Sequence, residues 1–443
     1  MLIPTNTLQS GFSHLPKSEN WEEDTAKIAE ILETVATRLH NNYPYPHPLY
    51  AGQMLKPPHA IAQAAYFLAM QINPNNHALD GGKESSAMEK EVVADIAKMF
   101  GWQQHLGHLT SGGTMANLEA LWVAGQLAEG KSVAASELAH YTHSRISGVL
   151  KIPFISIACD LKGKMDLQAL EKALQTGEIG TVVATLGTTG MGTCEDLQGI
   201  LALREKYAFR IHIDAAYGGY FTLAENLTED VKASFQAISQ ADSIVIDPHK
   251  HGLQPYGCGC ILFQNPEIGR LYAHDSPYTY FTSDALHLGE ISLECSRAGA
   301  AAVALWATMQ LFPLEKKGLF SQRLDASLTA SRLLYEKIGQ EKRFLRLISP
   351  TLDIVVWCVK GKSFSEISQL SKRLFIACEQ QHLYLALFQF PAKLIDVHLY
   401  PEWKSVEKDA EHIVCLRSCL MKPEHLDWVE RIWELLEKSI ALE

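Results

Sequence analysis

The chain has 443 residues, of which 47% are apolar, and a formal net charge of −11 at pH 7. This length exceeds one ordinary domain and predicts two domains that share an interface. The acidic balance, with no basic run to offset it, argues against a protein that neutralises nucleic-acid phosphates. Residues 1–20 lack the basic start and apolar core of a secretory signal, and no window is long enough to span a bilayer. We therefore expect a cytoplasmic protein with neither a nucleic-acid nor a membrane partner.

The cysteines indicate the redox state of the chain. There are nine, an odd number at irregular spacings, which fits reduced thiols better than a disulfide framework. Cys258 with Cys260 and Cys415 with Cys419 are the close pairs, and neither has a second pair or histidines at zinc-finger spacing. We expect buried structural thiols and no metal site.

The N-terminal region predicts an arm over residues 1–50. An amphipathic stretch covers residues 21–40, and residues 43–48 then alternate aromatic residues or histidine with proline. Alternating prolines exclude a helix and favour an extended path. An extended segment this rich in aromatic side chains needs a surface on which to lie.

Two helices are expected next, over residues 57–70 and 85–101, with Gly101 ending the second. The residues between them, 73–82, form a loop rich in turn formers that contains His77. A polar loop histidine is most often only that, but this one is also a candidate to border a substrate site.

Residues 110–117 read Thr-Ser-Gly-Gly-Thr-Met-Ala-Asn and open a predicted helix that continues to about Ala128. Small residues before a helix let backbone N–H groups approach an anion, and the helix N-terminus favours negative charge. The same letters also make an ordinary helix N-cap. The motif is therefore a candidate anion site that needs support from the rest of the chain.

Short β-branched runs predict strands over residues 132–136, 154–158 and 181–186. The first leads to His140 and Tyr141, and the third leads into Gly-Thr-Thr-Gly-Met-Gly at residues 187–192. Glycines there permit close backbone approach, and the Thr188 hydroxyl can donate a hydrogen bond to a bound group. A plain glycine-rich turn is an equally good interpretation.

Two further apolar runs, residues 211–213 and 243–246, stop abruptly at ionisable residues. The first ends at Asp214, and the second at Asp-Pro-His-Lys, residues 247–250. Buried parallel strands deliver side chains to the carboxyl edge of a sheet in this way. An acid and a lysine are thus expected at two such edges.

This pair of residues suggests a specific chemistry. A lysine among apolar neighbours loses its proton more easily than a solvated one, and Lys250 would then attack a carbonyl or a cofactor aldehyde. Asp214 would keep a pyridine nitrogen protonated. A Schiff-base lysine with an acidic partner for the pyridinium is what pyridoxal 5'-phosphate (PLP) chemistry requires. The alternative is that Asp214 and Lys250 are unrelated strand caps or a structural ion pair.

The last third of the chain begins with a tyrosine-rich loop over residues 272–288, which contains Tyr278 and Tyr280. Residues 294–299 then open an alanine-rich helix that ends near Leu311. Mixed helices and strands follow and indicate a separate α+β domain. Helices are expected over residues 319–338 and 365–380, and strands over residues 344–348, 354–359, 394–399 and 413–417. The predicted division is an arm at 1–50, a large domain at 51–312 and a small domain at 313–443.

The run His-Ile-Asp-Ala-Ala-Tyr-Gly-Gly from His212, followed by Asp-Pro-His-Lys, resembles the group II PLP-dependent amino acid decarboxylases, which are fold type I PLP enzymes. Other segments match in the same order, so the resemblance covers roughly residues 40–435. It implies an α/β fold, with a mostly parallel central sheet in the PLP-binding large domain and a smaller C-terminal α+β domain. It also implies loss of the α-carboxylate of an L-amino acid, which gives an amine and carbon dioxide.

The resemblance also implies roles for individual residues. Lys250 would bind the cofactor as a Schiff base, with Asp214 at the pyridine nitrogen. His140 would stack on the ring above the small side chain of Ala216, and His249 would reach the phosphate.

Further roles follow from the same resemblance. Gly113 and Thr114, together with Asn117, would hold the phosphate, and Thr188 would lie near the 3-hydroxyl of the ring or the substrate carboxylate. His77 would border the substrate. Tyr280 or Tyr278 would return a proton from a loop of the neighbouring subunit, because the family implies a homodimer with its active sites at the interface.

Two features bear on the substrate. Residues 294–299 have the Ser-Arg form of archaeal-type tyrosine or aspartate decarboxylases and of sphingosine phosphate lyases, and Ser296 is a candidate phosphate contact. Arg417, in Leu-Arg-Ser-Cys-Leu-Met-Lys-Pro, would orient a carboxylate. Aromatic residues in the arm and the loop suit a tyrosine- or tryptophan-like substrate, whereas Arg417 suits an acidic one. Both remain open.

Besides decarboxylation, two other hypotheses remain open: a different PLP reaction on the same fold, and a protein without catalysis. A PLP-dependent carbon–carbon lyase or an aminotransferase uses the same anchors, so Asp214 and Lys250 do not separate them from a decarboxylase. A keto-acid product would indicate the aminotransferase. A catalytically silent scaffold that acts by binding is the third hypothesis, and the intact lysine, aspartate and histidine argue against it.

Overall fold

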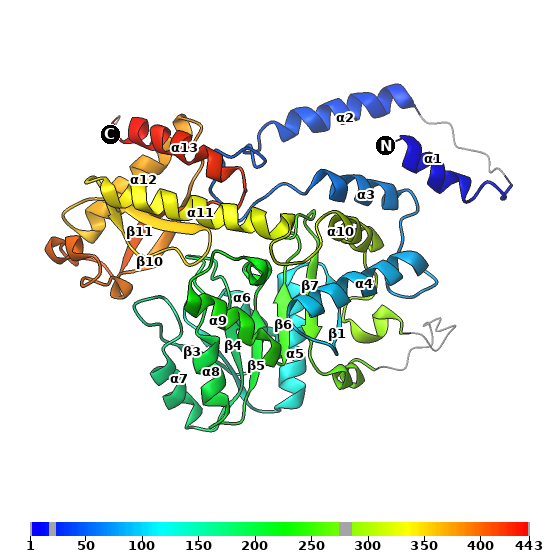
Figure 1. Cartoon of the computed structure of the whole chain (residues 1–443), viewed down its shortest axis with the longest axis horizontal. Helices are drawn as coiled ribbons and strands as arrows, with labels where there is room; N and C mark the ends of the chain where they lie inside the picture. The colour runs from blue at the N-terminus through cyan, green and yellow to red at the C-terminus, as the bar shows by residue number, and fades with distance from the viewer. Residues whose placement is uncertain (1, 17–23, 274–285, 442–443) are drawn as a thin grey trace.

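A computed structural model describes residues 2–16, 24–273 and 286–441. Its main feature is a seven-stranded sheet in the order β1-β7-β6-β5-β4-β2-β3 (Figure 1). Only β7 runs antiparallel to its neighbours, β1 and β6. The strands are β1 Leu106–Thr110, β2 Ser132–Ser136, β3 Phe154–Ile157, β4 Ile179–Thr185, β5 Arg210–Asp214, β6 Ser243–Ile246 and β7 Gly259–Phe263. The predicted mostly parallel sheet is confirmed.

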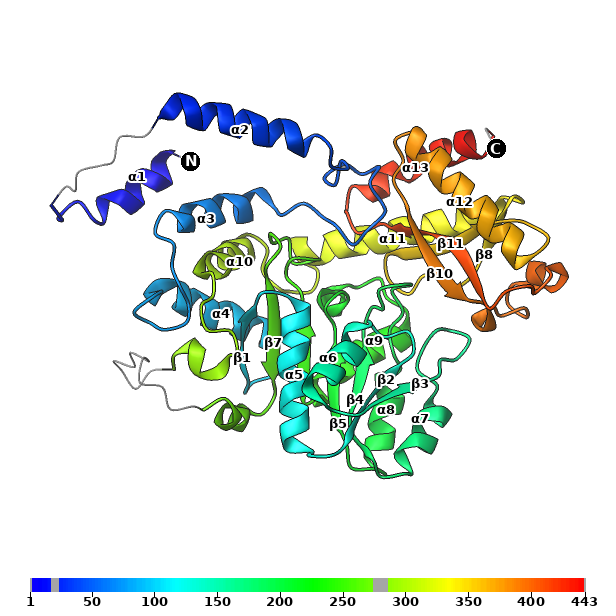
Figure 2. The same ribbon diagram turned by 180° about the vertical axis from the view of Figure 1, so that it is seen from behind.

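Helices cover both faces of this sheet. Helices α8 (Leu197–Arg204) and α9 (Glu229–Gln236) lie on the face seen in Figure 1, and α5 (Gly113–Leu127) and α6 (Thr142–Leu150) lie on the opposite face, seen in Figure 2. Every residue of β4 and β6 is buried, as expected of strands that are covered on both sides. Helix α7 (Leu167–Leu174) completes the layer beside α8.

A second sheet is built by the C-terminal part of the chain. It is antiparallel, in the order β10-β11-β9-β8. Its strands are β8 Phe344–Arg346, β9 Ile354–Val359, β10 Ala386–Pro391 and β11 His412–Cys419, and its helices are α11 Leu319–Gln340, α12 Phe364–Gln380 and α13 His425–Ile440. The expected α+β organisation is therefore present, with helices close to their predicted ranges.

The predicted strand over residues 394–399 is wrong. The Asp396 carboxylate accepts hydrogen bonds from the backbone N–H groups of His398 and Leu399, at 2.9 and 3.1 Å. This local turn competes with strand pairing. The strand that pairs with β11 is instead β10, which lies slightly earlier and ends at Pro391, as an edge strand can.

The predicted extended path over residues 43–48 is also wrong, because the segment folds into turns. The N–H of Tyr45 donates to the carbonyl of Tyr43, and the N–H of His47 donates to that of Pro44. The aromatic side chains do find a surface. The Tyr43 ring lies 5.1 Å from that of Tyr384, and the His47 ring lies 4.9 Å from that of Trp428, so this segment packs on the C-terminal part of its own chain.

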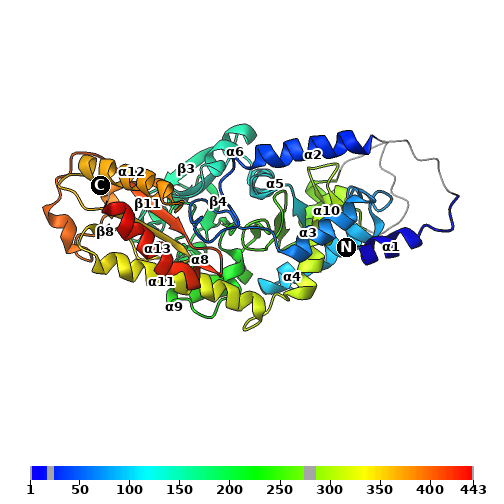
Figure 3. The ribbon, with the colours of Figure 1, turned by 90° about the horizontal axis from the view of Figure 1, so that it is seen from above.

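Before this segment, helices α1 (Leu2–Ser10) and α2 (Thr25–Leu39) extend away from the body of the molecule (Figures 1 and 3). Helices α3 (Ala60–Met70), α4 (Lys83–Met99) and α10 (Gly299–Leu311) lie beside the β1 edge of the large sheet. Gly101 follows α4 with a φ of +84°, a conformation that suits glycine at a helix end. In the described residues no helix is long and apolar enough to cross a membrane.

Candidate active site

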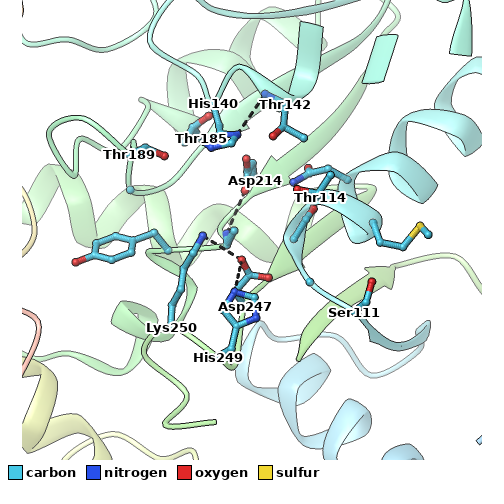
Figure 4. Close-up of a pocket in the computed structure, with 17 residues that line it drawn as sticks. Ser111, Thr114, His140, Thr142, Thr185, Thr189, Asp214, Asp247, His249 and Lys250 are labelled. Atoms are coloured by element: carbon cyan, nitrogen blue, oxygen red, sulfur yellow. Dashed lines mark hydrogen bonds and ion pairs between the residues drawn. The ribbon is translucent and has the colours of Figure 1, made fainter. Parts of the chain in front are cut away.

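The carboxyl ends of the parallel strands meet at one edge of the large sheet, as predicted. Strands β5 and β6 are neighbours, with Asp214 in register with Val245. Asp214 is the last residue of β5, and a tight turn from Asp247 to Lys250 follows β6. Between these segments lies a cavity of about 330 Å³ (Figure 4). Its lining includes eight of the predicted site residues: Gly113, Thr114, Asn117, His140, Asp214, Ala216, His249 and Lys250.

Asp214 is held by two donors. The N–H of Ala216 donates to Oδ1 at 3.1 Å, and His143 Nε2 donates to Oδ2 at 2.8 Å, with the His143 side chain fully buried. Burial alone would raise the pKa of Asp214, but the hydrogen bond and charge of His143, together with Lys250, hold that pKa well below its usual range. The carboxylate is therefore ionised and fixed in position.

The contact of His143 with Asp214 was not predicted from the sequence. The signal of His143 was its place in the first turn of α6, three residues after His140 and just beyond the carboxyl end of β2. Such a position faces the same sheet edge as Asp214. The contact joins β5 to α6 across 71 positions of sequence, so the spacing alone did not reveal it.

Lys250 has a charged partner within its own turn. Its Nζ lies 3.0 Å from Asp247 Oδ2, and His249 Nε2 lies 3.5 Å from the same oxygen (Figure 4). Burial lowers the pKa of Lys250, but Asp247 and Asp214 outweigh it and raise that pKa above its ordinary value. The expectation that apolar neighbours make this lysine easy to deprotonate is therefore wrong, because two carboxylates face it.

His140 projects into the cavity from the segment after β2. Its Nδ1 accepts the backbone N–H of Thr142 at 3.2 Å, which assigns the proton of the neutral ring to Nε2. Burial lowers the pKa of His140, and so does the nearby Lys250, while Asp214 raises it. The neutral ring thus has one N–H that can serve a bound molecule.

The start of α5 forms the other end of the cavity. Gly112 adopts a φ of +151°, and a Cβ there would lie 3.3 Å from Cε1 of His249. The lack of side chains keeps backbone N–H groups accessible at a helix N-terminus, where an anion is favoured. His249 lines the same end, and its buried Nδ1 has no hydrogen-bond partner among the described residues.

A second cavity of about 300 Å³ shares His140 and Thr189 with the first. Phe388 and Arg417 of the antiparallel sheet line it. Arg417 is buried, and its Nε and Nη2 have no hydrogen-bond partner in the described residues. Thr188 lines this second cavity rather than the first, and its hydroxyl is hydrogen-bonded to that of Thr193 at 2.7 Å.

Other predicted residues lie elsewhere. His77 is not in the lining of either cavity, and its carbonyl accepts the N–H of Gly289 at 2.8 Å. Ser296 is exposed and accepts a hydrogen bond from Asn75 Nδ2 at 3.2 Å. Tyr278 and Tyr280 lie outside the described residues.

The residues of the first cavity fit PLP. A helix N-terminus with small residues suits a phosphate, and so does a histidine nitrogen that has no partner within the described ranges. An ionised carboxylate suits a pyridinium, and a lysine suits an aldehyde. Gly113, Thr114 and His249 would face the phosphate, Asp214 the ring nitrogen and Lys250 the aldehyde carbon.

Comparisons with known proteins indicate the same cofactor. The model of the pyridoxal-dependent decarboxylase conserved domain matches residues 122–360. The chain is 28% identical to an L-tyrosine decarboxylase of Enterococcus faecium, over 79% of this chain and 75% of that protein. It is 26% identical to a probable L-aspartate decarboxylase of Pyrococcus furiosus, over 70% of this chain and 82% of that protein.

Solved structures share the fold. The structure of mouse CSAD matches with a TM-score of 0.78 at 19% identity. The match covers 97% of this chain and 91% of the CSAD chain. The structure of Oryza sativa TDC with PLP and tryptamine has a TM-score of 0.79 at 15% identity, with 98% and 91% covered.

Proposed function

The chain belongs to the pyridoxal-dependent decarboxylase family, and from this premise we propose which of its residues carry out the reaction. It is a PLP-dependent amino acid decarboxylase, a carboxy-lyase that converts an amino acid to the amine and carbon dioxide. The observation that carries the residue roles is the placement of Asp214, His140 and Lys250 around one cavity at the sheet edge.

Lys250 would attach covalently to the aldehyde of the cofactor, and Asp214 would hold the proton of the ring nitrogen. When bound, PLP supplies an electron sink for the pair left behind as carbon dioxide departs. Asp214 suits its role because His143 and the Ala216 N–H keep its carboxylate ionised and oriented. His249, Gly113 and Thr114 would bind the phosphate, and Ala216 would leave room for the flat ring.

A proton must replace the lost carboxylate on the α-carbon. His140 lines the cavity with a neutral ring whose Nε2 carries a proton, so it is one donor. Tyr280, from the loop that the family supplies to a neighbouring subunit, is the other, with Tyr278 as its neighbour. If His140 is the donor, His140→Gln should slow protonation of the α-carbon. If Tyr280 is the donor, Tyr280→Phe should slow it.

Arg417 would orient the substrate. Its buried guanidinium lines the cavity that joins the first one at His140, and two of its nitrogens have no hydrogen-bond partner among the residues that the structure describes. A substrate carboxylate would satisfy them. Since a tight clamp on the departing carboxylate would stabilise the ground state, we assign Arg417 to orientation rather than to the chemical step.

For the substrate class we propose a tyrosine-like or an aspartate-like L-amino acid. The relatives are L-tyrosine decarboxylases and L-aspartate decarboxylases by name. Phe388 beside Arg417 suits an aromatic side chain, and the guanidinium suits an acidic one. Competition between L-tyrosine and L-aspartate for a single preparation would rank the two.

We further propose a homodimer in which α2 packs on a second copy of the chain. None of the described side chains of α2 is buried. Its apolar face is exposed at Ile28, Ile31, Leu32, Val35 and Leu39. An apolar stripe of this size in water favours a protein partner, and a symmetric pair of such helices meets that need. Ile31→Asp with Val35→Asp should give a monomer by sedimentation, whereas Lys27→Asp on the same helix should not.

The interpretation of the chain as an arm at 1–50, a large domain at 51–312 and a small domain at 313–443 remains our proposal. The two sheets support it, although one hydrophobic cluster runs from β5 to β9 and joins them. All nine cysteines are unpaired, which supports a reducing compartment, and we propose the cytoplasm.

The test is product analysis on the purified, PLP-loaded protein. Carbon dioxide and the matching amine, with no keto acid, would support the assigned roles when they disappear in Lys250→Ala. A keto-acid product would indicate an aminotransferase, and fragments other than carbon dioxide would indicate a carbon–carbon lyase.

A further inference from the structure

Asp247 is a buried carboxylate at the cavity, and the proposed reaction assigns it no role. Its residue is only 2% exposed, and Oδ1 has no hydrogen-bond partner in the described part of the chain. Burying an ionised carboxylate is costly unless another group compensates it. Its compensating partners are Lys250 at 3.0 Å and, more weakly, His249 at 3.5 Å.

The local backbone directs the lysine to this carboxylate. The N–H of Lys250 donates to the carbonyl of Asp247 at 2.9 Å, which closes the turn and brings the two side chains to the same side. The neighbouring helix makes room for the carboxylate. A Cβ on Gly113 would lie 2.7 and 2.9 Å from the Asp247 oxygens, so a larger residue at this position would displace the carboxylate. Gly113 thus leaves room for the Asp247 carboxylate, and the turn places Lys250 beside it.

The two acids at the sheet edge have separate partners. Asp214 is engaged by His143 and by the Ala216 N–H, and Asp247 is engaged by Lys250. Asp214 is therefore placed to contact the ring nitrogen of the cofactor, and Asp247 is placed to pair with the lysine.

We propose that Asp247 is the resting partner of Lys250, a positioning residue that receives the lysine ammonium whenever Lys250 is not bonded to the cofactor. This inference rests on the proposed role of Lys250. It applies to the cofactor-free protein and to the stage of each cycle at which the substrate amine has displaced the lysine.

The exchange of Lys250 for the substrate amine conserves bonds, protons and charge when Asp247 receives the lysine. Lys250 Nζ gives up its bond to the aldehyde carbon of the cofactor as the amino nitrogen of the substrate forms one there. Nζ would already carry one proton in its bond to the cofactor, and the substrate would enter as an ammonium and pass two protons to it. The lysine would then leave as an ammonium, the new bond would keep one proton on the substrate nitrogen, and total charge would be unchanged. Asp247 Oδ2 accepts that ammonium within the same turn, which keeps it clear of the reacting carbon.

The pairing also predicts how capture of the cofactor depends on pH, since only the neutral amine attacks an aldehyde. Several groups face Lys250. Asp247 and Asp214 favour its charged form, and Tyr256 does so when ionised. His140, from the segment after β2, and His249 and His251, on either side of Lys250 in its own segment, disfavour the ammonium when they are protonated. Removing Asp247 should therefore ease deprotonation while the other groups stay in place.

The experiment compares Asp247→Asn with the wild type. PLP is added to the cofactor-free proteins between about pH 6 and pH 10, and the adduct at Lys250 is trapped by cyanoborohydride and located by mass spectrometry. The variant should reach half-maximal capture at least about one pH unit lower, and should react about tenfold faster near neutral pH. An unchanged midpoint would overturn the inference. Asp242→Asn, at the opposite end of β6 beside Arg210, is the control and should match the wild type.

A second measurement needs no variant at Asp247. A reduced phosphopyridoxyl-tyrosine or phosphopyridoxyl-aspartate adduct fills the site and cannot react with Lys250. In a crystal structure of the wild type with this adduct, Lys250 Nζ should lie within hydrogen-bond distance of Asp247. A lysine directed elsewhere would contradict the proposal. If the wild type failed to capture PLP at Lys250 at all, the proposed role of Lys250 would fail instead.

Discussion

Replacing His143 by leucine tests whether the carboxylate at the sheet edge needs its buried donor. His143 Nε2 and Asp214 Oδ2 are 2.8 Å apart, and their side chains are 0% and 8% exposed. A hydrogen bond to a charged group contributes about 1.5–3 kcal/mol. If the transition state loses that stabilisation through a misoriented or partly protonated Asp214, kcat should fall by about 10- to 150-fold. Only the N–H of Ala216 would then hold the carboxylate.

His143→Gln is the matched control, because the glutamine amide can place a donor close to the position of Nε2. We expect kcat for carbon dioxide release to fall in the leucine variant and to recover in large part in the glutamine variant. Capture of PLP at Lys250 should persist in both, which separates this effect from unfolding. A leucine variant with kcat within about twofold of the wild type would refute the reasoning, since a factor of two is below 1 kcal/mol.

Four further predictions follow from the site and its surroundings. Lys250→Ala should abolish both covalent capture of PLP and turnover, and any retained turnover would remove Lys250 from the mechanism. Asp214→Asn should still bind PLP but lose about 100- to 1,000-fold in kcat, as when one preorganised electrostatic group is removed; an unchanged rate would contradict its role. Arg417→Met should raise KM about 10- to 100-fold for the loss of a charged hydrogen bond, with a smaller effect on kcat, and the reverse pattern would place Arg417 in the chemical step. Burial lowers the pKa of His212 to about 3, so the unfolded chain takes up a proton that the folded chain does not. The stability that His212 contributes is complete above about pH 6.5 and is lost as pH falls toward its folded pKa, by about 1.4 kcal/mol per unit. In thermal unfolding at pH 7 and pH 5, His212→Gln should therefore lose less stability than the wild type, and an equal loss would refute this.

The sequence predicted the central edge of the site because its signals are local. Residues 211–213 and 243–246 are short apolar runs that stop at Asp214 and just before Asp247. Since neighbouring parallel strands end at the same edge, the meeting of their terminal side chains follows from strand geometry. The glycines before α5 are a local signal of the same kind, and the start of this helix lines the cavity.

The features that sequence reasoning missed depend on contacts between distant segments. His143 meets Asp214 through the packing of α6 beside the sheet, and no periodicity reports that contact. The lysine pKa was predicted in the wrong direction because the two carboxylates that face Lys250 were not weighed against its apolar surroundings. The strand that is β10 in the structure was predicted too late in the chain, at residues 394–399. The apolar residues there suggested a strand, but the Asp396 carboxylate holds them in a turn.

The most direct test of the account is carbon dioxide release from the purified, PLP-loaded protein against the common L-amino acids, with Lys250→Ala beside it. We expect release, with the matching amine, from L-tyrosine, L-aspartate or a close relative of one of them, and none from the variant. No release from any of these amino acids, although PLP is covalently held at Lys250, would contradict it.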